Sequence, residues 1–136
     1  MDPVVHFEMP YQDKQRMADF YSKTFGWVPK MLGPDMNDYV VVATSETDSA
    51  TMLPKKPGMI NGGFYKKSAD APVPSVVIAV DDIKASMEKV KASGGQIVGL
   101  QPSGEPYMIP GTGLYVAIID SEGNRVSMLQ PLPMNN

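Results

Sequence analysis

The chain has no cysteine among its 136 residues. This absence excludes disulfide bonds, thiolate metal ligands and cysteine nucleophiles together. Small secreted domains commonly depend on disulfides, so the sequence favours a reducing, cytoplasmic location.

The chain also lacks a long apolar run and an excess of positive charge. No stretch approaches the roughly 20 apolar residues of a membrane-spanning helix, and the acidic start MDPVVHFEMP does not have the pattern of a secretory signal. The formal net charge is -3 and the lysines are scattered, so we expect neither nucleic acid nor a membrane as a partner. The length suits one compact domain, and 43% hydrophobic residues are typical of a globular protein.

Histidine is nearly absent, since His6 is the only one in the chain. It lies in the stretch PVVHFEMP, where Val5, Phe7 and Met9 alternate with His6 and Glu8. This period of two predicts a half-buried strand over residues 4–9, with its polar face turned away from the helices. His6 could belong to a metal site, act as a catalytic base or be a polar residue on a strand.

The rest of the first half predicts one helix and three strands. In QDKQRMADFYSKTFGW, Asp13 is a candidate N-cap, apolar residues recur at three-to-four spacing, and Gly26 ends the helix. The segments WVPKML, DYVVVATSE and MINGGFYKK then predict strands, the last one interrupted by glycine. The connector SADAPVP has no periodicity and places a joint near residue 70.

The second half repeats this β-α-β-β-β order. PSVVIAVDD predicts a strand, DIKASMEKVKASGG a helix, and GGQIVG, LYVAIID and RVSMLQP three strands, with LQPSGEPYMIPGTG as a long loop. An offset of 69 residues places Asp13 on Asp82 and Gly26 on Gly95, so the halves match in polarity and punctuation.

Two segments, VVHFEMPYQDKQRMADFYSKTFGW and AIIDSEGNRVSMLQP, together with this repeat, resemble the vicinal oxygen chelate superfamily. That superfamily contains glyoxalase I, bleomycin-resistance proteins, fosfomycin-resistance enzymes and extradiol dioxygenases, and INGGFYKK resembles a bacterial glyoxalase-like subgroup. The resemblance implies an α+β fold in a single domain, 1–136, built of two βαβββ modules at about 1–70 and 71–136. Their strands would form a curved eight-stranded mixed sheet around a cleft, with the helices outside, and the protein would be a homodimer.

The resemblance also assigns positions to a metal site, because enzymes of the superfamily bind a divalent metal in the cleft. The first ligand position falls on His6. The second falls on Ser75, where the metalloenzymes have histidine, and the third falls on Ser127, where they have glutamate. A serine hydroxyl is a poor ligand for Zn, Ni, Mn or Fe, so we expect no metal cofactor, with His6 as the one remaining ligand. The alternative is a divalent metal held with replacement carboxylates such as Glu8 and Glu105.

His6 and Glu8 are the candidate catalytic residues. They share one strand face, which the implied fold turns into the cleft, and histidine titrates near neutral pH, so the pair could transfer protons or hydrogen-bond a ligand. The glycine- and proline-rich loop over residues 102–113 could close over the site as a lid. The candidate ligand-binding residues are Ser75, Ser127, Tyr39, Tyr107 and Tyr115, the tyrosines through stacking or hydrogen bonds.

Three functions remain open. The first is a glyoxalase/bleomycin-resistance-like protein that has lost the metal triad and binds or transforms a small organic molecule. The second is a metal-dependent lyase, isomerase or dioxygenase of the glyoxalase type. The third is an interaction module whose cleft is vestigial.

Overall fold

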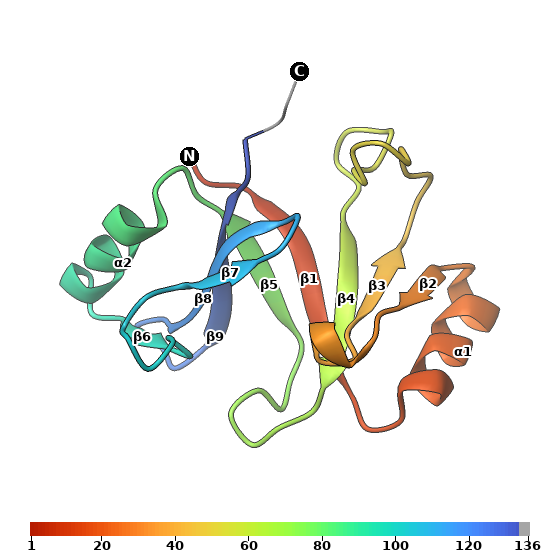
Figure 1. Cartoon of the computed structure of the whole chain (residues 1–136), viewed down its shortest axis with the longest axis horizontal. Helices are drawn as coiled ribbons and strands as arrows, with labels where there is room; N and C mark the ends of the chain where they lie inside the picture. The colour runs from red at the N-terminus through yellow and green to blue at the C-terminus, as the bar shows by residue number, and fades with distance from the viewer. Residues whose placement is uncertain (134–136) are drawn as a thin grey trace. The chain divides into compact units, whose positions relative to one another are not determined.

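The computed structural model describes residues 1–133 and contains two α-helices and nine strands, which confirms the α+β class (Figure 1). In chain order the elements are β1 (Val4–Tyr11), α1 (Lys14–Phe25), β2 (Val28–Met31), the short 3-10 helix η1 (Pro34–Met36), β3 (Val40–Ala43), β4 (Asn61–Lys66), β5 (Ser75–Ala79), α2 (Ile83–Ala92), β6 (Gln96–Val98), β7 (Tyr107–Ile109), β8 (Gly113–Ile119) and β9 (Arg125–Pro131). Within that part of the chain, neither α-helix has the length and hydrophobicity of a membrane span.

The chain forms two compact units, which we describe separately. The first module is His6–Pro74, and the second module is Met1–Val5 together with the chain from Ser75 onward. Each module carries one α-helix and its own set of paired strands.

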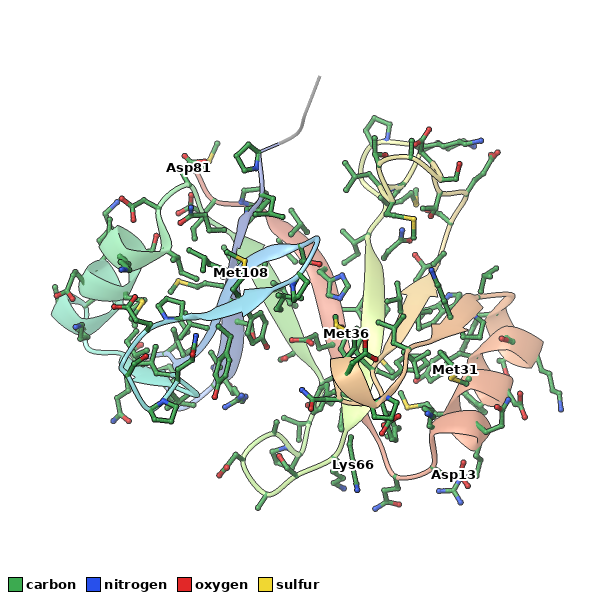
Figure 2. The ribbon with its side chains drawn as sticks, viewed as in Figure 1. Asp13, Met31, Met36, Lys66, Asp81 and Met108 are labelled. Atoms are coloured by element: carbon green, nitrogen blue, oxygen red, sulfur yellow. The ribbon has the colours of Figure 1, made fainter. Side chains whose placement is uncertain are left out.

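In the first module the strands are ordered β2-β3-β4-β1, with β1 and β4 parallel and the other pairs antiparallel. Helix α1 begins where the Asp13 side chain accepts a hydrogen bond from Arg16 N at 2.9 Å and ends at Gly26, whose φ is 74°. Figure 2 labels Asp13 at this start and Met31 at the end of β2. The core under α1 consists of Tyr11, Val40, Val42 and Phe64, against which Phe7, Met9, Met17, Tyr21 and Trp27 pack.

In the second module the strands are ordered β5-β9-β8-β6, and β7 pairs with β8. Helix α2 begins at Asp82, which accepts from Ala85 N at 3.1 Å. The core under α2 consists of Val80, Ile83, Met87, Val116, Ile118 and Met128. Burying such aliphatic side chains contributes about 1.5–3 kcal/mol each, so these helices are held by packing more than by their own propensity.

Two details differ from the expectation. The segment expected to be an irregular loop contains β7, on which Met108 lies (Figure 2), so residues 1–133 hold nine strands rather than eight. Strand β7 pairs with β8, with Tyr107 opposite Tyr115 and Ile109 opposite Gly113. The local sequence pattern does not predict this pairing. The glycine that follows the second helix also shifts by one position. Helix α2 ends at Ala92 with Ser93 as its C-cap, and Gly94, not Gly95, takes the positive φ of 90°.

Candidate functional site

The strand face opposite α1 carries the two candidate catalytic residues. Phe7 and Met9 pack on the core side of β1, so His6 and Glu8 point to the other face, as the alternation predicted. The parallel register sets His6 beside Asn61 and Glu8 beside Gly63 on β4. Both polar side chains therefore lie within one patch of the first module.

Tyr39 joins these two residues. Its hydroxyl lies 3.0 Å from His6 Nε2 and donates a hydrogen bond to Glu8 Oε2 at 3.2 Å. When Tyr39 donates its proton to Glu8, its oxygen accepts from His6, which places the proton of the neutral imidazole on Nε2. Three residues named from the sequence thus form one hydrogen-bonded group.

Gly63 makes this arrangement possible. A Cβ atom at this position would overlap the ring and hydroxyl of Tyr39, so only glycine leaves room for the ring to cross β4. The neighbouring Gly62 gives the same space to the Phe7 ring on the opposite face. The sequence predicts a strand interrupted by glycine, but the contact of Tyr39 with Gly63 was not predicted. A pair of glycines inside a strand was the available signal.

Burial changes the acid–base properties of His6. Removal from solvent lowers the pKa of His6 from 6.5 to about 4, because desolvation disfavours the charged imidazolium. The expectation that this histidine titrates near neutral pH is therefore wrong. At neutral pH His6 is an uncharged hydrogen-bonding group.

The second module holds the other predicted residues. Tyr115 and Ser127 face each other on β8 and β9, with their hydroxyl oxygens 2.6 Å apart, and Ser127 is only 1% exposed. Ser75 is half-buried at the start of β5, and Tyr107 on β7 is 45% exposed. Within residues 1–133, neither Ser75 nor Tyr107 forms a side-chain hydrogen bond with another predicted site residue.

Two surface hollows lie away from these residues. One, of about 440 Å³, is lined by the start of α1 and the end of β1, including Asp13, Arg16 and Tyr11. The other, of about 650 Å³, lies beside α2 and includes Glu105, which forms an ion pair with Lys84 at 2.8 Å. Neither is lined by His6, Glu8 or Tyr39.

A family model of the glyoxalase/bleomycin resistance protein/dioxygenase superfamily matches residues 4–128. The chain belongs to this superfamily. A glyoxylase-like domain-containing protein of Didymella fabae is 32% identical over 125 residues, which cover 86% of this chain and 84% of the relative.

Solved structures share the fold of this superfamily member. A selenomethionine methylmalonyl-CoA epimerase has a TM-score of 0.66 at 16% identity and covers 96% of this chain and 95% of its own. Methylmalonyl-CoA epimerase from Mycobacterium tuberculosis has a TM-score of 0.62 at 14% identity, covering 96% and 88%. Identities this low establish the fold alone.

The donors in the described part of the chain do not fit the divalent metal that many members of the superfamily bind. No group of three or more His, Cys, Asp or Glu side chains among residues 1–133 could hold a metal ion. His6 Nε2 and Glu8 Oε2 are directed to the Tyr39 hydroxyl, and Ser127 is directed to Tyr115. Glu105, named above as a replacement metal ligand, forms an ion pair with Lys84.

Proposed function

We propose that this superfamily member binds a small organic molecule through hydrogen bonds from the His6–Glu8–Tyr39 group, without a catalytic metal. The observation that carries the proposal is the Tyr39 hydroxyl, which takes the coordinating atoms of His6 and Glu8 into a hydrogen-bonded group. The imidazole of His6, the carboxylate of Glu8 and the phenol of Tyr39 together present both hydrogen-bond donors and acceptors. Such a set can orient a ligand inside a largely apolar protein surface.

The pKa values favour binding over acid–base catalysis by His6. A general base works best when its pKa lies near the working pH, and the His6 pKa of about 4 makes it a weak base at neutral pH. If the protein transforms its ligand, Glu8 is the other candidate residue, with the Tyr39 hydroxyl bonded to its carboxylate. Within the second module, we propose Ser75, Ser127, Tyr107 and Tyr115 as ligand-contacting residues.

A metal-dependent lyase, isomerase or dioxygenase is the second candidate. Superfamily membership and the glyoxylase-like relative support it, and methylmalonyl-CoA epimerase shares the fold. Metal analysis separates the two candidates. Protein purified without chelator is analysed for Zn, Ni, Mn and Fe; a stoichiometric metal that disappears in His6→Ala would overturn the metal-free proposal.

A ligand screen by thermal shift tests the binding proposal directly, because a ligand that binds only the native state raises the melting temperature. Compounds that stabilise the wild type are repeated on Tyr39→Phe, which removes the bridging hydroxyl. Tyr11→Phe is the matched control, since it also removes a tyrosine hydroxyl, one that donates to the backbone at Asp38 O and not to His6 or Glu8. We expect the increase in melting temperature to become smaller in Tyr39→Phe and not in Tyr11→Phe. An equal reduction in both variants would contradict the proposal. If no compound stabilises the wild type, the result favours an interaction module with a vestigial site.

We further propose that the protein is a cytoplasmic homodimer that needs neither nucleic acid nor membrane. The superfamily membership supports the dimer, and the net charge of -3 supports the absence of polyanionic partners. Light scattering of the purified chain tests the assembly. A monomer at micromolar concentration would contradict it.

A further inference from the structure

Arg125 lies on the same strand face as Ser127. Strand β9 alternates, with Val126 and Met128 packed into the core under α2, so Arg125 and Ser127 point to the opposite face. The register pairs Val77 with Ser127, and two residues earlier along each of these parallel strands are Ser75 and Arg125. Arg125 thus belongs to the face of the second module that carries the predicted ligand-binding serines.

The guanidinium of Arg125 is half-buried and has no protein partner within residues 1–133. Four other cations in that range form ion pairs, but no hydrogen bond or ion pair involves the Arg125 side chain. Two carboxylates precede Arg125 in the β8–β9 turn. Glu122 forms no ion pair within residues 1–133, and Asp120 accepts hydrogen bonds from Glu122 N, Asn124 N and the Asn124 side chain. A partly desolvated cation without a counter-charge is unfavourable, so this site has a place for an anion.

A glycine without a side chain lies beside the guanidinium. Arg125 Nη2 lies 3.9 Å, and the Ala117 methyl 3.8 Å, from the point where a side chain on Gly99 would begin. Gly99 has no side chain to fill this space, and its φ of 69° restricts other residues. The Arg125 side chain therefore reaches from β9 across β8 to the backbone at Gly99.

We propose that Arg125 binds the carboxylate of a small organic acid on this face, beside the Tyr115–Ser127 hydroxyl pair. The planar guanidinium presents N–H donors in a fork that matches the two oxygens of a carboxylate. The proposal rests on the proposed function in that it names the chemical class of a small organic ligand, here for the second module taken by itself. Arg125 was missed from the sequence; the signal was a charged residue in phase with Ser127 on an otherwise apolar strand.

Benzoate and benzamide are the probes, because they share shape and differ in charge. Each is titrated into the full chain while the backbone amide of Gly99 and the Nε–H of Arg125 are followed by NMR. Benzoate should shift both signals saturably, and benzamide should not. Arg125→Gln should weaken benzoate binding at least tenfold with an unchanged circular dichroism spectrum, and Arg125→Lys should weaken it less. Arg16→Gln, at the hollow beside the start of α1, should leave it unchanged.

The opposite results are equally clear. Equal binding of benzamide, or unchanged benzoate binding in Arg125→Gln, would overturn the proposal and leave Arg125 as a packing residue. Inorganic phosphate is titrated in parallel, and tighter binding of phosphate than of benzoate would reject a carboxylate. If Tyr39→Phe does not change the melting-temperature shifts caused by ligands but Arg125→Gln does weaken benzoate binding, the proposed function is refuted and this inference stands. If Tyr39→Phe reduces those shifts but Arg125→Gln leaves benzoate binding unchanged, this inference is refuted and the proposed function stands.

Discussion

The pH dependence of stability provides a direct test of the buried, uncharged His6. The pKa of His6 falls from 6.5 to about 4 on burial, so between these values the unfolded chain binds a proton that the folded chain does not. The stabilisation is present above pH 6.5 and is lost as the pH falls toward 4. A difference of about 2.5 pKa units corresponds to about 3 kcal/mol in full, of which about 2 kcal/mol is lost between pH 7 and pH 5.

The assay is urea denaturation of the wild type and His6→Gln at pH 7 and pH 5. Glutamine keeps a donor that can reach Tyr39 but does not titrate, so the variant should lack the loss of about 2 kcal/mol that His6 causes in the wild type. Carboxylates with lowered pKa values, such as Asp48 and Asp120, are hydrogen-bonded in turns and exert their effect below about pH 4. NMR titration of the single imidazole gives its pKa directly. The reasoning is refuted if that pKa is near 6.5, or if both proteins lose the same free energy of unfolding.

Four substitutions test the packing at Gly63, the cap of α2 and two buried serine hydroxyls. Gly63→Ala should displace the Tyr39 ring, lower the free energy of unfolding by about 1–3 kcal/mol and move the His6 pKa back toward 6.5, as measured by urea denaturation and NMR; an unchanged pKa would contradict it. Asp82→Ala should cost about 1 kcal/mol in urea through loss of the α2 cap, and no change would contradict the capping role. Ser127→Ala should also lower the free energy of unfolding by about 1 kcal/mol, because it removes the hydrogen bond to Tyr115. Ser45→Ala should be nearly neutral, because Ser45 Oγ is buried without a hydrogen-bond partner among the described residues. Equal effects of the two substitutions would contradict a stabilising role of the Ser127–Tyr115 bond.

Local patterns predicted the elements of both modules. The caps at Asp13 and Asp82 were predicted because capping depends on a few consecutive residues. The faces of β1 were predicted because strand alternation is set by the backbone itself, so the apolar side, with Phe7 and Met9, had to meet the core under α1. Strand β7 was not predicted, because it depends on pairing with β8, which residues 107–109 do not encode by themselves.

The candidate site was predicted as a set of residues but not as an arrangement. His6, Glu8 and Tyr39 were all named, yet the bond of Tyr39 to both required an empty position at Gly63, on a different strand. The His6 pKa was predicted wrongly for the same reason, since desolvation depends on residues that pack around the ring and not on its neighbours along the chain. Arg125 was missed although it lies two residues before Ser127 on β9, because its lack of an ion pair within residues 1–133 and its approach to Gly99 depend on the folded chain.

The distribution of charge on the second module also bears on the choice between a metal and an anion. The positions of β5, β8 and β9 that face away from α2 include Arg125 and contain no Asp or Glu. The position where metalloenzymes of the superfamily have a glutamate is Ser127, whose hydroxyl already bonds to Tyr115. A divalent cation would therefore meet a positive charge and neutral hydroxyls here, whereas a carboxylate would meet a cation and hydrogen-bond donors. The electrostatics of this face favour an anionic ligand over a metal ion.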